Sequence, residues 1–129
     1  MCRQGCGAFT GEMAVDQIKD LGMKCVLIGH SERRGEFGLP TPKESNALMA
    51  TKLQYILDQG LMAVFCVGEP LPVREQGIAA VLAECVAQLQ DIVPILKALK
   101  DKSRVSALRN KKTRTITNHT QKRTVNHEP

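Results

Sequence analysis

Two short runs of apolar residues constrain the fold of this chain more than any other feature. They cover residues 23–29 and 61–67, and glycines bound both of them. Their apolar residues are continuous rather than alternating with polar ones, which is typical of parallel strands buried on both faces. Parallel strands need a long connection, and the chain between the runs is long enough to hold a helix. The sequence therefore predicts two parallel strands joined by a right-handed crossover.

The connection between the runs carries the clearest helix pattern. Thr41 is a good N-cap, Pro42 suits the first helical position, and Glu44 completes a capping box. The helix is predicted to end before Gly60. Its apolar stripe consists of Met49, Leu53, Ile56 and Leu57.

Two further helices flank the strands. One is predicted over residues 13–21, and the other follows residue 77 and should stop or kink at Pro94. The order helix, strand, helix, strand, helix predicts the α/β class, with helices covering at least one face of a parallel sheet. Two strands do not close a sheet. We therefore expect the middle of something larger, with helix stripes partly uncovered and sheet edges unpaired. The stripe of the last helix consists of Ile78, Val81, Leu82, Cys85, Val86, Leu89 and Ile92.

The net charge of +5 hides a division of the chain into two parts. Residues 1–96 hold 8 Lys and Arg against 11 Asp and Glu, whereas residues 97–129 hold 10 against 2. The second part has few large apolar residues and no sustained period. We predict a globular part over 1–96 and a basic, disordered extension over 97–129. The extension could bind nucleic acid or anionic surfaces, but it lacks aromatic residues for base stacking, so we favour a solvated tail.

Composition also bears on the cellular compartment. Five cysteines, an odd number without metal-ligand spacing, favour free thiols and indicate no metal site. The longest apolar run is too short to cross a bilayer, and no signal peptide opens the chain. We predict a cytoplasmic protein without membrane contact.

Chemically active side chains follow both predicted strands. His30 comes directly after the first apolar run, and Glu69 comes shortly after the second. In α/β folds the catalytic groups gather at the carboxyl ends of the strands. From this spacing alone, His30 is either a catalytic residue or a loop histidine satisfied by backbone bonds. Glu69, Arg74 and Glu75 are expected to form ion pairs in their loop.

Three linked motifs stand out on these elements. They are Gly7-Ala8-Phe9-Thr10-Gly11-Glu12, then Leu27-Ile28-Gly29-His30-Ser31-Glu32-Arg33-Arg34, then Cys66-Val67-Gly68-Glu69 with Arg74-Glu75 and Gly77. In order and spacing they resemble the triosephosphate isomerase family. The resemblance covers about residues 5–93 and corresponds to the end of the third strand through the fifth helix of a (β/α)₈ barrel. It implies an incomplete TIM-barrel fragment with parallel strands, followed by the basic tail.

The resemblance implies an isomerase that interconverts dihydroxyacetone phosphate and glyceraldehyde 3-phosphate in glycolysis and gluconeogenesis. In this family a glutamate base moves a proton through an enediolate, a neutral histidine polarises the carbonyl, and a lysine stabilises the negative charge. His30 matches the electrophilic histidine, and Glu32 matches the supporting glutamate that pairs with the lysine. The alternative for Glu32 is an exposed acid beside two arginines. No cofactor is implied.

The first motif resembles the loop through which the family forms homodimers. Phe9, Thr10, Gly11 and Glu12 are therefore candidate dimer-interface residues, with Thr10 reaching toward the partner's active site. A glycine-flanked surface turn is the alternative. Triose phosphate is the small-molecule partner that the resemblance implies.

The chain also departs from the family's pattern. The family's first-strand asparagine and lysine, its Tyr-Glu-Pro base, its lid and its phosphate loops have no counterpart in these residues. Phe37-Gly38-Leu39 stands where the family has Phe-Gly-Glu, so one buried acid is expected to be lost. We therefore predict that this chain alone is inactive.

Overall fold

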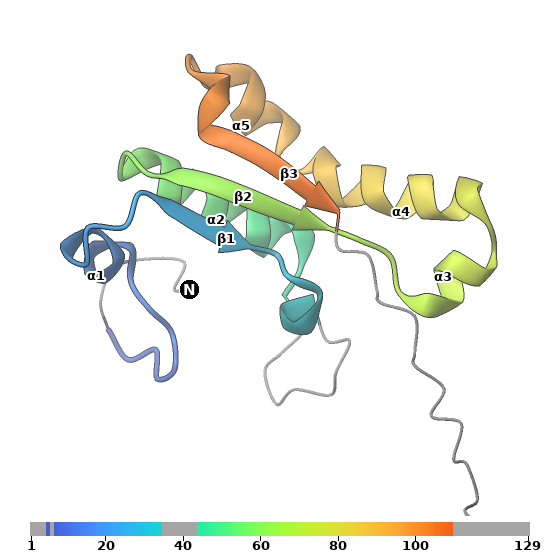
Figure 1. Ribbon diagram of the computed structural model, residues 1–129, viewed down its shortest axis with the longest axis horizontal. Helices are drawn as coiled ribbons and strands as arrows, with labels where there is room; N and C mark the ends of the chain where they lie inside the picture. Colours follow the sequence, from blue (N-terminus) through green and yellow to red (C-terminus); the bar gives the residue numbers. More distant parts are fainter. Residues whose placement is uncertain (1–4, 6, 35–43, 110–129) are drawn as a thin grey trace, which may run out of the picture.

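The computed structural model describes residues 5, 7–34 and 44–109, which form a parallel three-stranded sheet with helices (Figure 1). The two apolar runs form two of the strands, and the predicted α/β class with parallel pairing is confirmed. The sheet order is β1-β2-β3. The strands are β1 (Cys25–Ile28), β2 (Met62–Val67) and β3 (Val105–Arg109).

β3 lies within the segment that was predicted to be a disordered extension. All five of its residues pair with β2, ending with Arg109 opposite Val67. The fold therefore extends to Arg109, and the predicted boundary at residue 96 falls inside helix α5 (Val93–Ala98). Four of the five β3 residues are exposed. The strand is therefore held mainly by its pairing with the edge of β2 rather than by burial of its side chains. The remainder of the extension, residues 110–129, lies outside the described residues.

Two basic side chains just before β3 form hydrogen bonds within the fold, whereas a solvated tail was predicted for this segment. Arg104, at the end of the short turn η2 (Lys102–Arg104), donates to the Leu57 and Leu61 carbonyl oxygens at 2.6 and 2.9 Å. Lys102 donates to the Leu96 carbonyl oxygen at 3.2 Å. These side chains anchor the connection into β3, which does not favour a nucleic-acid-binding role for Lys102 and Arg104.

α2 (Asn46–Asp58) forms the crossover between β1 and β2, and it begins later than predicted. Ser45 rather than Thr41 is its N-cap, and its hydroxyl accepts the Leu48 N–H at 3.1 Å. Glu44 precedes the helix, and its carboxylate accepts bonds from basic side chains instead of closing a capping box. Thr41 itself lies outside the described residues.

The core lies between α2 and one face of the sheet, and α1 (Val15–Asp20) packs beside them (Figure 1). Every residue of the predicted α2 stripe is at most 5% exposed. Burying a large apolar side chain of this kind stabilises the fold by about 1.5–3 kcal/mol. From the sheet the core takes Val26, Ile28, Ala63, Phe65 and Val67.

Two helices follow β2, namely α3 (Leu71–Glu75) and α4 (Ile78–Gln90). Pro94 lacks the N–H that would continue α4, and it occupies the first turn of α5 instead. The α4 stripe is partly uncovered, as expected, because Val81 is 4% exposed and Ile78 is 68% exposed. No helix within the described ranges has the length and apolar content to span a membrane.

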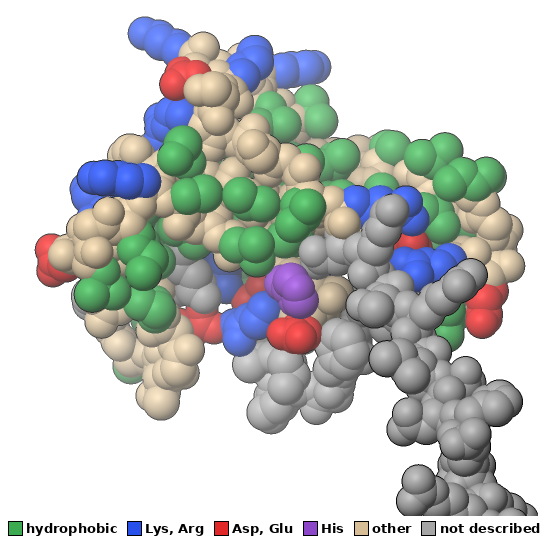
Figure 2. Space-filling view, viewed as in Figure 1, with side chains coloured by type: hydrophobic (Ala, Val, Ile, Leu, Met, Phe, Trp, Pro, Cys, Tyr) green, Lys and Arg blue, Asp and Glu red, His purple; other side chains and the backbone are tan. Residues whose placement is uncertain are grey.

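The face of the sheet away from α2 is open. Leu27, Met62 and Leu108 are each between 43 and 52% exposed, and Figure 2 shows hydrophobic side chains gathered across this face. Among the described residues, the outer edges of β1 and β3 pair with no further strand. The sheet is thus open on one face and at both edges, as expected for a slice of a larger structure.

Candidate active site

His30 stands at the carboxyl end of a strand. β1 ends at Ile28, and after Gly29 the chain enters the short turn η1 (Ser31–Arg34). The imidazole is 41% exposed. Its Nδ1 atom accepts the Glu32 N–H at 3.4 Å and lies 3.7 Å from the Glu32 carboxylate.

The two contacts at Nδ1 call for different protonation states of His30. The Glu32 carboxylate attracts Nδ1 only when Nδ1 carries a proton, whereas the Glu32 N–H can donate only to an Nδ1 whose lone pair is available. The amide proton is always present, and the Glu32 side chain is 59% exposed to competing water. When Nδ1 accepts the Glu32 N–H, the ring proton lies on Nε2.

Gly29 brings the ends of β1 and β2 into close contact. Its φ of +74° lies in the left-handed region that favours glycine. A β-carbon at this position would lie 2.9 Å from the Cys66 carbonyl oxygen and 2.9 Å from the Arg34 guanidinium. Both the backbone conformation and the lack of space therefore require glycine directly before His30.

Arg34 bridges the same two strand ends. Its Nε donates to the Gly29 carbonyl oxygen at 2.9 Å, and a terminal nitrogen donates to the Cys66 carbonyl oxygen at 3.3 Å. The other terminal nitrogen donates to Asn46 Oδ1 at 2.8 Å. The guanidinium carbon lies 5.9 Å from the centroid of the Phe65 ring. Burial lowers the pKa of Arg34, but an arginine stays charged at neutral pH.

Glu69, just beyond β2, is buried and doubly paired. Its carboxylate accepts hydrogen bonds from Arg109 and Arg74, each at 2.8 Å. The hydrogen bond from Arg109, opposed by burial and supported by Arg74, lowers the pKa of Glu69 to about 2. The predicted pair with Arg74 is present but buried, and Glu75 is exposed. The pair with Arg109 was missed because β3 was assigned to the extension.

Gln88 on α4 holds the residue before Glu69. Its Nε2 donates to the Gly68 carbonyl oxygen at 2.6 Å, and its Oε1 accepts the Gly68 N–H at 3.0 Å. Gln88 is only 4% exposed. This pairing satisfies both backbone groups of Gly68, and a glutamine within a helix carries no sequence signal for it.

A second charged cluster joins the N-terminal loop to α2. Lys52 Nζ bonds Glu44 at 2.6 Å, and Arg33 bonds Glu44 at 3.0 Å and also bonds Glu12. Glu44 and Lys52 are 6% and 4% exposed. Leu39 lies outside the described residues, so the expected loss of an acid at that position stays a prediction, and Glu44 is a buried acid five residues further along the chain.

The candidate dimer-interface residues lie in one loop. Thr10 and Gly11 are exposed, and Phe9 is half-buried. Glu12 is bound to Arg33 of its own chain. Their contribution to a dimer stays a prediction.

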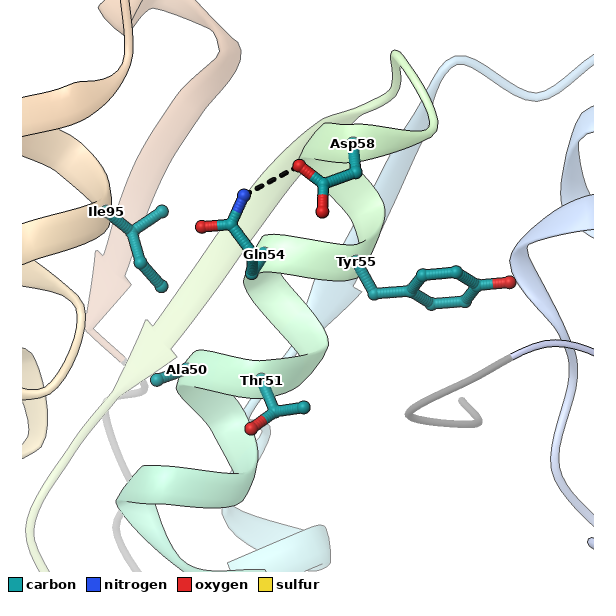
Figure 3. A pocket seen from close by; sticks show the side chains of 6 residues that line it. All are labelled: Ala50, Thr51, Gln54, Tyr55, Asp58 and Ile95. Atoms are coloured by element: carbon teal, nitrogen blue, oxygen red, sulfur yellow. Dashed lines mark hydrogen bonds between the residues drawn. The ribbon is translucent and has the colours of Figure 1, made fainter.

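His30 lines none of three pockets that the described residues form. The first, of about 590 Å³, lies between Gly11 and Leu21 beside α1, and the other two lie beside α2. One, of about 240 Å³, lies at the start of α2 beside Gln88. The other, of about 450 Å³, is a groove between α2 and α5 (Figure 3). There Gln54 donates to Asp58 at 2.7 Å along the helix surface, with Ile95 across the groove. Within the described ranges, no three His, Cys, Asp or Glu side chains could hold a metal ion.

Parallel βα units with polar side chains at the carboxyl ends of their strands are the arrangement of the α/β-barrel enzymes. A comparison with family models is more specific. The model described as triosephosphate isomerase matches residues 1–108. The chain therefore belongs to the triosephosphate isomerase family.

Individual relatives agree over part of their length. Triosephosphate isomerase of Sulfurovum sp. (strain NBC37-1) is 43% identical over 86 residues, which are 67% of this chain and 35% of the relative. That of Taenia solium is 49% identical over 73 residues, or 57% and 27% of the two chains. The chloroplastic triosephosphate isomerase of Arabidopsis thaliana is 45% identical over 91 residues, or 68% and 27%. The chain thus spans between 27 and 35% of the length of these relatives.

β3 lies beside β2 in the sheet and reads Val105-Ser106-Ala107-Leu108-Arg109. Arg109 at its end binds Glu69.

Proposed function

We propose that this chain forms the fourth and fifth βα units and the sixth strand of a triosephosphate isomerase barrel, in which His30 polarises the substrate carbonyl. The observation that carries the proposal is the Glu32 N–H facing Nδ1 of His30. With Nδ1 engaged in this way, Nε2–H is the donor of a partly exposed imidazole at a strand end. Such a donor can bond a carbonyl oxygen and exchange protons with the enediolate that forms from it.

The substrate class in this proposal is a triose phosphate, as the names of the relatives imply. The reaction would serve glycolysis and gluconeogenesis in the cytoplasm. The loop with Phe9, Thr10, Gly11 and Glu12 would face a second subunit. Glu32 would support the site by orienting the ring of His30.

We further propose that this chain alone is inactive. Proton abstraction next to a carbonyl needs a carboxylate that can accept a proton near neutral pH. Glu69 cannot do so, because its carboxylate is bound by two arginines and its pKa is about 2. The sixth strand ends in Arg109 rather than in the family's base. The base, the lysine and the phosphate loops would have to come from other residues.

A segment exchange tests both parts of the proposal. Residues 7–93 of this chain would replace the matching segment of the Sulfurovum isomerase, which keeps its own base and lysine. We expect isomerisation of glyceraldehyde 3-phosphate by the chimera. His30→Gln should lower its kcat by about 10²-fold or more, whereas the exposed Glu75→Gln should leave kcat unchanged.

The isolated chain should show no turnover above its His30→Ala variant. Turnover above that variant would refute the proposed inactivity. A folded chimera whose kcat is the same with and without His30 would refute the role of His30.

A further inference from the structure

We propose that Arg34 is a positioning residue that sets the orientation of His30 by tying the carboxyl ends of β1 and β2 together. The inference rests on the proposed function of His30. It goes beyond that function because Arg34 has no contact with the imidazole among the bonds described, and acts through the backbone on either side of it.

The bonds of Arg34 reach both strand ends at once. The Gly29 carbonyl, bonded at 2.9 Å, belongs to the peptide group that leads into His30. The Cys66 carbonyl, bonded at 3.3 Å, belongs to the second-to-last residue of β2. A single planar guanidinium therefore fixes the chain before His30 relative to the neighbouring strand.

Arg34 is also the last residue of η1, the turn that supplies the Glu32 N–H to Nδ1. Its side chain thus returns from the end of this turn to Gly29, two residues before the turn begins. Loss of the guanidinium would free the Gly29 carbonyl and loosen both ends of the segment that holds the imidazole. The 3.4 Å bond to Nδ1 is long, so it depends on this support.

Close packing supports a specific need for arginine. The guanidinium approaches Gly29 so closely that even a β-carbon there would lie 2.9 Å from it. It also lies over Phe65, a fully buried core residue. A lysine ammonium has no planar fork and cannot reproduce the contacts to the two carbonyls and the ring together.

The neighbouring Arg33 provides a matched control. Its side chain bonds Glu12 and Glu44, which belong to the N-terminal loop and the approach to α2. None of the side-chain hydrogen bonds described for Arg33 goes to a strand end. Replacing Arg33 should disturb packing and stability without turning the ring of His30.

The test is nitrogen-15 NMR of the histidine rings in the full 129-residue chain, with the His30 signals identified by their loss in His30→Gln. The expected wild-type spectrum has the proton of the neutral His30 ring on Nε2. Arg34→Gln should raise the share of the Nδ1–H form to that of free histidine in the same buffer. Arg33→Gln should retain the wild-type ratio, and Arg34→Lys should lie between the two.

Circular dichroism would identify variants that remain folded. A folded Arg34→Gln chain with the wild-type tautomer ratio would overturn the inference. If that variant unfolds, Arg34→Lys decides, and a wild-type ratio there would also overturn it. Equal changes of the tautomer ratio in Arg33→Gln and Arg34→Gln would also overturn it, because Arg34 would then act only through packing. An inactive chimera with these NMR results intact would refute the proposed function while leaving the coupling between Arg34 and the ring in place.

Discussion

The ends of β1 and β2 occupy equivalent positions in successive βα units, yet they are built differently. Beyond β1, His30 and Glu32 are 41% and 59% exposed, and one long amide bond orients the ring. Beyond β2, Glu69 is fully enclosed by two arginines, and Gly68 is bonded through both of its backbone groups. One end leaves a titratable group accessible, and the other holds a charge permanently.

This difference separates a group suited to chemistry from one suited to structure. A general acid or base must gain and lose a proton near the working pH. A carboxylate with a pKa of about 2 does not, whereas an imidazole that accepts the Glu32 N–H at Nδ1 can donate through Nε2 to a substrate. Equivalent position along a barrel strand therefore does not identify a catalytic residue, and the partners around the group decide.

The largest effect on the free energy of unfolding is expected at Gly29, where the carboxyl ends of β1 and β2 come into contact. Gly29→Ala should lower the free energy of unfolding by about 3 kcal/mol, because it combines a left-handed backbone with collisions at the Cys66 carbonyl and Arg34. Gly22→Ala is the matched control, with φ of +73° and nothing within 4 Å of the added carbon. It should cost about 1 kcal/mol. Urea unfolding of both variants measures the difference, and equal losses would show that the close approach has no cost.

A smaller effect on the free energy of unfolding is expected at Glu69, the charged residue beyond β2. Glu69→Gln should lower the free energy of unfolding at pH 7 by about 1–3 kcal/mol, because both arginines lose a charged acceptor. The exposed Glu75→Gln should change it by less than about 0.5 kcal/mol. Similar losses in the two variants would mean that Glu69 is not a structural charge.

The same residue predicts a pH dependence. The folded-state pKa of Glu69, about 2, lies below the ordinary value of 4.5. Its stabilising contribution is therefore complete above about pH 4.5 and is lost as the pH falls toward 2. Urea midpoints measured between pH 5 and 2 should fall more steeply for the wild type than for Glu69→Gln. Parallel curves would contradict the low pKa.

The smallest effect is expected at the accessible end. His30→Ala and Glu32→Gln should each change the free energy of unfolding by less than about 0.5 kcal/mol, since both side chains are well exposed. Thermal unfolding followed by circular dichroism provides the measurement. A loss as large as that of Glu69→Gln would show that the β1 end is structural too, and the comparison would fail.

Several features could be predicted because they are local. Continuous apolar runs located β1 and β2, and the four-residue stripe of α2 is buried as its spacing indicated. The position of His30 after a strand followed from the same runs. The start of α2 could not be predicted, because Ser45 competes for the cap while tertiary contacts with Lys52 and Arg33 hold Glu44.

The sequence by itself determined the parallel α/β pattern and the residues that face the core, because periodicity acts over a few residues. Only the tertiary structure decided that residues 105–109 form a strand, that Arg109 holds Glu69, and that Arg34 links two strand ends. These contacts join residues about 30 to 45 positions apart or depend on a neighbouring strand edge. Their partners are brought together by the folded sheet, so no local pattern in the chain encodes them.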